Sequence, residues 1–235
     1  MKLKPTVLFL FNSSSYAPQP WLDDGGYNVV SVDYDNTDHS GTPRPTGGHT
    51  RLNLDLTAPD VVLQINSALT DLGFAQPSFI LSFTPCTDMA VSGAAHFARK
   101  AAKVPNFQAK AVALARLVEQ WPCPSIVENP VSILATRWKK PTGYVHPWMF
   151  AHQCPSGAHP EFPDVIPASD MYPKKTGLWC QNGAKMPIQS SFVVPELAQF
   201  HGHTNLGGKS ARTKYIRSLT PRGLAAAIYQ ANTTE

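Results

Sequence analysis

The chain has 235 residues, of which 43% are hydrophobic and 15% charged, a balance that excludes a largely disordered protein and fits one α/β domain. No apolar run is long enough to cross a bilayer, and the 22 prolines predict long irregular connections. The net charge of +4 is concentrated in residues 121–235, which hold 11 basic and 6 acidic side chains and so suit a polyanionic partner such as nucleic acid.

The first part of the chain alternates predicted strands and helices. Residues 6–11 form a continuous apolar run, typical of a buried parallel strand, and residues 28–33 read as a second strand that ends on an acid. Residues 36–50 are rich in turn formers and predict a loop. Residues 58–72 have helical periodicity, and residues 78–83 predict a third strong strand.

The second part is less regular. Residues 108–120 predict an amphipathic helix, residues 125–129 a further strand, and residues 223–231 a closing helix. Residues 141–210 are dominated by proline, glycine, histidine and aromatic residues, which indicates an irregular insertion or a small lobe that faces the target. The alternation predicts a single domain over 1–235, built as a doubly wound Rossmann-like α/β sheet with helices on both faces.

Polar side chains follow every predicted strand. In a doubly wound sheet the ligand lies beyond the carboxyl ends of the strands, so these side chains are expected to lie close together. They are Asn12, Ser13 and Ser14 after the first strand, Asp33 and Asp35 after the second, Cys86 and Asp88 after the third, and Glu128 and Asn129 after the next.

Two of these positions carry motifs. T-P-C-T-D at 84–88 directly follows a buried strand, where the start of a helix would favour a thiolate at Cys86. E-N-P at 128–130 also directly follows a strand. Together they resemble the Pro-Cys and Glu-Asn motifs of DNA cytosine carbon-5 methyltransferases. The resemblance implies that Cys86 adds to carbon 6 of the base, that Glu128 shares a proton with ring nitrogen 3, and that Asn129 shapes the loop around Glu128.

The resemblance extends over most of residues 78–230. The runs E-N-P-V-S-I-L-A-T-R-W-K-K-P, H-P-W-M-F, K-K-T-G-L-W and I-R-S-L-T-P-R-G-L-A-A-A-I are similar to a compact family of phage-borne cytosine-specific DNA methylases, as is the Val-Ser-Gly that follows Pro-Cys-Thr. This likeness implies a class I methyltransferase fold, DNA as partner and S-adenosylmethionine as donor. Asp33 and Asp35 would then hold the donor ribose, and Asp55 lies where an acid near the adenine is often found.

The chain departs from this family in two places. The first loop reads F-N-S-S-S-Y-A-P-Q-P-W, without the glycines that let backbone approach the donor, so Asn12, Ser13 and Ser14 would have to substitute. There is little room for a large target-recognition domain, and a Gln-x-Arg-x-Arg element is not evident. Pro85, Thr87, Arg137 and Arg212 are therefore the candidates for contacting the base or the phosphates.

Two other functions stay open from the sequence. The same thiol chemistry serves a pyrimidine modification that uses another donor, or that acts on a free pyrimidine nucleotide. A degenerate methylase fold could also bind DNA, or blunt a host defence, without catalysis. The experiment that separates these functions is an analysis of the bases in DNA exposed to the protein.

The cysteines are expected to be reduced, because the apolar start lacks a small-residue cleavage site and so indicates a cytoplasmic protein, in a bacterial or phage-infected cell. His152, Cys154, His159 and Cys180 have the mixed nitrogen and sulfur ligands that zinc prefers. Their spacing matches no common zinc finger. We therefore expect no metal site.

Overall fold

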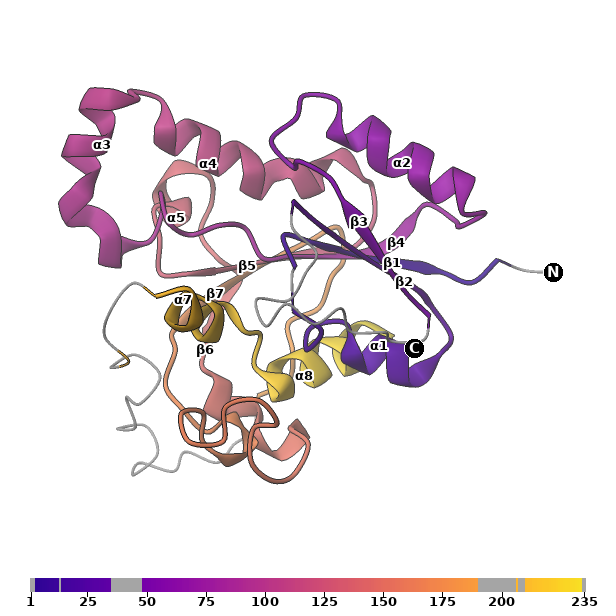
Figure 1. Ribbon diagram of the computed structural model, residues 1–235. Helices are drawn as coiled ribbons and strands as arrows, with labels where there is room; N and C mark the ends of the chain where they lie inside the picture. The colour runs from indigo at the N-terminus through magenta and orange to yellow at the C-terminus, as the bar shows by residue number, and fades with distance from the viewer. Residues whose placement is uncertain (1–2, 13, 35–47, 190–205, 207–209, 234–235) are drawn as a thin grey trace.

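The computed structural model describes residues 3–12, 14–34, 48–189, 206 and 210–233. These residues form one seven-stranded sheet with helices on both faces (Figure 1). The sheet order is β3-β2-β1-β4-β5-β7-β6. The strands are β1 (Thr6–Leu10), β2 (Asn28–Asp33), β3 (His49–Asn53), β4 (Pro77–Ser82), β5 (Ser125–Pro130), β6 (Gly143–Val145) and β7 (Thr176–Gln181).

Five strands, β3, β2, β1, β4 and β5, are parallel, while β7 pairs antiparallel with both β5 and β6. The chain runs outward from β1 to β2 and β3, then returns to β4 on the other side of β1. This reversal makes the ends of β1 and β4 the topological switch point, where doubly wound sheets bind their ligands. The order confirms the predicted Rossmann-like α/β sheet with helices on both faces.

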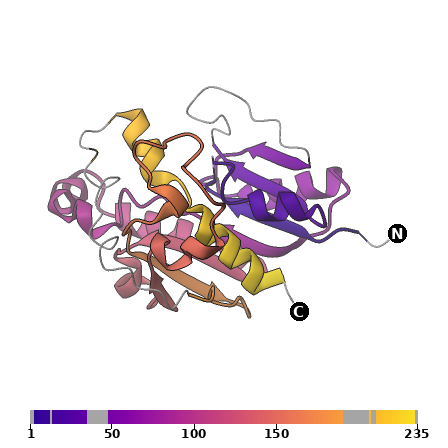
Figure 2. The ribbon, with the colours of Figure 1, turned by 90° about the horizontal axis from the view of Figure 1, so that it is seen from below.

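The helices divide between the two faces of the sheet. On one face lie α2 (Val61–Asp71) and α4 (Phe107–Ala115), and on the other lie α1 (Gln19–Asp24) and α8 (Arg222–Thr233) (Figure 1). The view from below shows α8 running on from α7 (Ala211–Ser218) along the underside of the sheet (Figure 2). The remaining helical segments are η1 (Val91–His96), α3 (Phe97–Lys103), η2 (Arg116–Gln120), α5 (Leu134–Arg137), η3 (Pro147–Gln153), η4 (Ala168–Asp170) and α7 (Ala211–Ser218).

The alternation of side chains along β1 builds the two halves of the core. Leu8 and Leu10 point to the face of α2 and α4, whereas Val7 and Phe9 point to the face of α1 and α8. All four side chains are fully buried, which explains why residues 7–10 are all apolar instead of alternating with polar residues.

Several elements were not predicted from the sequence. The strand β3 begins at His49, inside the range 36–50 that predicts a loop, although residues 35–47 lie outside the described part of the chain. The strands β6 and β7 lie within the range 141–210 and complete the sheet, so the irregular part is narrower than expected. Between them, residues 146–175 contain only the short segments η3 and η4. In the part of the chain that the structure describes, no helix is long and apolar enough to span a membrane.

Candidate active site

A cavity of about 160 Å³ lies at the carboxyl ends of β1, β4 and β5. It brings together the two motifs singled out in the sequence, although Cys86 and Glu128 are separated by a helical connection along the chain. The residues that line it are Phe11, Asn12, Ser14, Phe83, Thr84, Pro85, Cys86, Glu128, Pro130, Lys174, Arg217 and Ser218.

Cys86 and Glu128 influence each other electrostatically inside this cavity. Burial raises the pKa of the Cys86 thiol, and the nearby carboxylate of Glu128 raises it further. Burial also raises the pKa of Glu128, against which the Lys174 charge and a hydrogen bond from Thr176 act. A carboxyl group with a raised pKa holds a proton closer to neutral pH, which suits an acid that must donate one.

Lys174 is a residue of this site that the motifs did not predict. It lies two residues before β7, and its ammonium lowers the pKa of both Cys86 and Glu128. Its Nζ donates to the Arg217 carbonyl oxygen at the end of α7, 3.1 Å away, so α7 helps to hold it over the cavity. In the sequence, Lys174 belongs to a pair of lysines directly before a buried apolar run. This pair points to the site only when β7 is known to lie beside β5.

Asn129 connects the two motif loops. Its side chain is fully buried, and its Nδ2 donates to the Thr84 carbonyl oxygen at 2.8 Å. The bond ties the end of β5 to the segment that carries Cys86. The Asn129 Oδ1 atom is buried and has no hydrogen-bond partner among the described residues.

The loop after β1 is held in place by hydrogen bonds of its own side chains. Phe11 takes a left-handed backbone conformation with φ of 55°, at the position where glycine is usual in this fold. Asn12 is buried, and its Nδ2 donates to the Ser14 carbonyl oxygen at 2.8 Å and to Ser31 Oγ at 3.1 Å. Ser31 Oγ in turn lies 2.8 Å from His49 Nε2, so a chain of polar contacts runs beneath the loop from β1 to β3.

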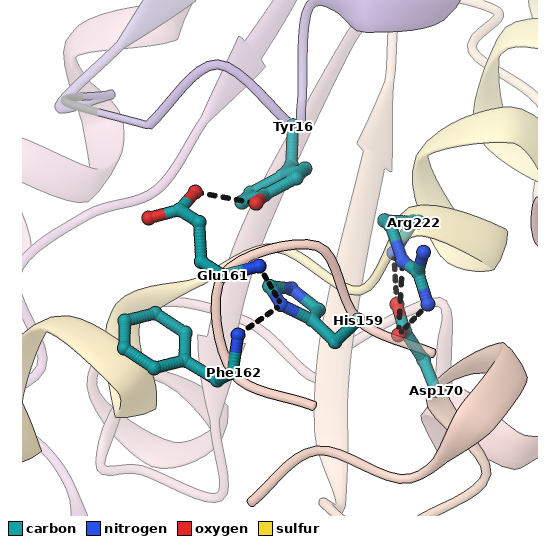
Figure 3. A network of polar contacts seen from close by, with 6 residues as sticks. All are labelled: Tyr16, His159, Glu161, Phe162, Asp170 and Arg222. Carbon is teal, nitrogen blue, oxygen red and sulfur yellow. Dashed lines mark hydrogen bonds and ion pairs between the residues drawn. The ribbon is translucent and has the colours of Figure 1, made fainter. Parts of the chain in front are cut away.

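A second network fixes the loop from the outside (Figure 3). The Tyr16 hydroxyl forms a short hydrogen bond to Glu161, whose other carboxylate oxygen accepts from Tyr215 at 3.2 Å. His159 Nδ1 accepts the backbone N–H groups of Glu161 and Phe162, which shapes the turn that carries Glu161. The loop after β1 is therefore covered by residues that follow β6 and by α7.

The described residues differ from the usual S-adenosylmethionine site in the loop after β1 and at the candidate acids. Asn12 and Ser14 line the cavity, but both are buried, and their side chains form hydrogen bonds with each other and with Ser31. Asp55 is exposed, and its carboxylate accepts the backbone N–H and the hydroxyl of Thr57 in a local turn. Asp33 Oδ1 accepts the backbone N–H of Tyr34 at the end of β2. Ser13 and Asp35 lie outside the described residues.

The other sequence candidates lie apart from the cavity, except Pro85, which lines it. Arg137 is exposed at the end of α5, and Arg212 stacks on the Phe162 ring with its guanidinium carbon 5.5 Å from the centroid. The described lining of the cavity includes neither of them, but it includes Arg217 and Lys174.

The histidines and cysteines considered as zinc ligands do not form a cluster in the described part of the chain. The described part of the chain contains no group of three or more His, Cys, Asp or Glu side chains placed to hold a metal ion. His159 Nδ1 accepts backbone N–H groups in the turn at Glu161, and Cys180 lies on β7. Cys154 is buried beside Asp170, and burial together with the charge of Asp170 raises the pKa of its thiol to about 12. His152 lies at the end of η3.

A buried ion pair joins the irregular segment to the closing helix (Figure 3). Asp170 accepts hydrogen bonds from the Arg222 side chain at 2.8 and 3.1 Å and from the Arg222 backbone N–H at the start of α8. The side chains are 2% and 9% exposed. This contact places α7, and with it Arg217, relative to the cavity, because α7 and α8 are separated by only three residues.

The sheet order and the site together define a doubly wound, Rossmann-like α/β domain with a thiol and a carboxyl group at the switch-point edge. No family model matches the chain, and neither does any curated protein. Among solved structures, a proposed DNA modification methyltransferase encoded within an E. coli prophage is similar at 11% identity and a TM-score of 0.41, covering 75% of this chain and 46% of that chain. A short chain dehydrogenase from Leptospira borgpetersenii, solved with NAD+, is similar at 12% identity and a TM-score of 0.27, covering 48% of this chain and 46% of that chain. This chain thus matches less than half of either protein, and likenesses this weak carry no argument about function.

Proposed function

We propose that this protein is a cytosine-modifying enzyme that activates the base through a covalent adduct with Cys86, with methylation of carbon 5 in DNA as the reaction. The observation that carries the proposal is the shared cavity of Cys86, Glu128 and Lys174. A nucleophilic thiol, an acid and a cation are the groups that addition to a pyrimidine ring requires.

The first step is addition of Cys86 Sγ to carbon 6 of the base. The thiol gives up its proton, the new carbon–sulfur bond takes up the sulfur electron pair, and the electrons of the C5–C6 double bond move toward ring nitrogen 3. Nitrogen 3 gains a proton in the same step, so Glu128 can carry the proton from sulfur to nitrogen and the net charge is conserved. The Lys174 ammonium stabilises the negative charge of the Cys86 thiolate and of the Glu128 carboxylate, as its lowering of both pKa values indicates.

The adduct makes carbon 5 a nucleophile that can take a one-carbon group. The donor of that group loses its leaving group together with the bonding electron pair. Loss of the carbon-5 proton to a base then expels Sγ as the thiolate, and nitrogen 3 gives its proton back through Glu128, so the aromatic ring and the resting thiol are restored. In duplex DNA the base has to leave the stack to reach the thiol, because the ring atoms that react are not accessible within the helix. The basic lysine and arginine at the cavity would meet the phosphates or the base oxygen of the extruded nucleotide.

Nucleoside mass spectrometry tests the proposal directly. DNA from cells that lack their own cytosine methylases and express the wild type should contain 5-methyldeoxycytidine, and DNA from cells that express Cys86→Ser should not. Cys180→Ser is the matched control, because Cys180 is a partly exposed cysteine on β7 outside the cavity. Unmodified bases with the wild type would reject the methylation, and retained DNA binding in that case would indicate a non-catalytic DNA-binding protein.

The closed first loop favours a second candidate, in which the same adduct takes its carbon group from a donor other than S-adenosylmethionine. Buried Asn12 and the left-handed Phe11 are the observations behind it. Titration calorimetry with S-adenosylmethionine separates the two. Absence of binding, together with a Cys86-dependent covalent complex with a 5-fluorocytosine oligonucleotide, would support this candidate over methylation by the usual donor.

A further inference from the structure

A second and larger hollow of about 910 Å³ lies on the other side of the Cys86 loop, against α3 and α4. Its wall is mostly apolar and includes Val104, Phe107 and Leu114. Its charged groups are Lys100, Lys103 and Lys110, with Asp88 at the base. We call it the lysine groove. Concave sites with apolar walls and a few placed charges are the form that ligand sites take in proteins.

The lysines of the groove are not equivalent. Lys100 forms a short salt bridge with Asp88 and also donates to the Thr87 carbonyl oxygen at 3.3 Å, so its charge is used within the Cys86 loop. Lys103 and Lys110 are exposed, and within the described ranges neither side chain has a hydrogen-bond or ion-pair partner. The nearby Asp55 is engaged by Thr57, which lines the same groove. Two ammonium groups therefore face the groove without a carboxylate to neutralise them.

The groove adjoins the active-site cavity. Pro85 lines both hollows, Cys86 lines the cavity, and Thr87 and Asp88 line the groove. Consecutive Cα atoms lie about 3.8 Å apart, so the two hollows are separated by the thickness of one loop. A molecule with one base at Cys86 has its neighbouring parts within reach of the groove.

We propose that the lysine groove binds the nucleotide next to the modified base on the same strand, with its base against the apolar wall and its phosphates on Lys103 and Lys110. This inference rests on the proposed action at a base in nucleic acid. A base that packs against an apolar wall has to be unpaired, because its faces and edges are otherwise occupied in the duplex. The groove thereby favours single-stranded or locally opened DNA, and it gives the protein a preference for the flanking base.

The test measures binding rather than modification, so it does not depend on turnover. Fluorescence anisotropy would follow a labelled single-stranded oligonucleotide with one central cytosine, with Cys86→Ser as the background in every protein. The variant is Lys103→Gln/Lys110→Gln. The matched control is Lys140→Gln/Lys185→Gln, which removes the same charge from two exposed lysines outside both hollows.

The Lys103→Gln/Lys110→Gln variant should bind the oligonucleotide about tenfold or more weakly at low salt. The slope of log K against log salt should become less steep by about 1.4, because each of the two lost phosphate contacts contributes about 0.7. The control should change neither by a comparable amount. An abasic site next to the cytosine should weaken binding by the wild type, and a duplex should bind less well than the single strand. Equal losses in both double variants would overturn the proposal, as would tighter binding to the duplex.

A free nucleotide is the other source of the same chemistry. Deoxyadenosine monophosphate at millimolar concentration should compete only weakly with the oligonucleotide, and competition as strong as that of the strand would reject the assignment to a neighbouring nucleotide. If the groove variant behaves as expected while DNA from expressing cells is unmodified, the groove still binds a nucleotide of the strand, and only the proposed modification fails. If modification occurs and the groove variant binds normally, the groove assignment alone fails.

Discussion

Cys86 and Glu128 come from neighbouring parallel strands and line one cavity, where the carboxylate adds to burial in raising the pKa of the thiol. Lys174 acts in the opposite sense on the same thiol. Removing the negative charge in Glu128→Gln should therefore lower the Cys86 pKa and speed its alkylation by iodoacetamide near pH 8. Removing the positive charge in Lys174→Met should raise the pKa and slow alkylation. Peptide mass spectrometry across a pH series would give both pKa values.

Cys123 provides an internal control for this experiment. Burial raises its pKa to about 11, and it lies in the core two residues before β5, at the end of this strand opposite to the cavity. Its alkylation should therefore be slow and equal in all three proteins. Shifts of the same sign at Cys86 in the two variants would show that the charges of Glu128 and Lys174 do not set its reactivity.

The contact between Asn129 and Thr84 predicts a second result. Asn129→Leu removes the donor to a buried carbonyl oxygen and should lower the free energy of unfolding by about 1–3 kcal/mol, the usual cost of a buried group left unpaired. Part of this loss is offset, because the unpartnered Oδ1 disappears as well. Asn129→Asp keeps the shape but replaces the donor with a carboxylate oxygen, so it should cost more than Asn129→Leu. Urea unfolding of the three proteins checks the order, and a milder effect for Asn129→Asp would contradict this account.

The parts of the fold that were predictable from the sequence are those with a strong local pattern. The strand β1 has four consecutive apolar residues and β4 has three, and α2 has one apolar face, so each is visible in a short window. The strand β6 has three residues and β7 contains Gly177, and both are strands because of their neighbours in the sheet rather than their own pattern. The motif residues Cys86 and Glu128 could be placed at one edge, because parallel strands end at one edge. Lys174 could not, because its position depends on an antiparallel strand that was not predicted.

Removing one partner of the buried pair of Asp170 and Arg222 should destabilise the protein more than removing both. Asp170→Asn leaves a guanidinium that is 9% exposed without its counter-charge, a change that costs about 3–5 kcal/mol when a buried partner is removed. The double variant Asp170→Leu/Arg222→Met removes both charges and should be closer to the wild type in stability than Asp170→Asn. Thermal or urea unfolding measures both, and additive losses in a double-mutant cycle would show that the two side chains do not interact.

His49 gives the protein a defined dependence of stability on pH. Burial, with a contribution from Arg51, lowers the His49 pKa to about 4, whereas an unfolded histidine has a pKa of about 6.5. As the pH falls from 6.5 toward 4, the unfolded chain takes up a proton that the folded protein does not, so this group lowers the free energy of unfolding across that window. Well above pH 6.5 the imidazole is neutral in both states and contributes no dependence. Between pH 7 and pH 5, the free energy of unfolding of His49→Gln should therefore fall less than that of the wild type. The control is Ser31→Ala, which removes the hydroxyl 2.8 Å from Nε2 but keeps the histidine. Its free energy of unfolding should still fall over this window. Urea unfolding of all three proteins at pH 7 and pH 5 measures these changes. An equal fall of the free energy of unfolding in His49→Gln and the wild type would show that His49 is not the group responsible.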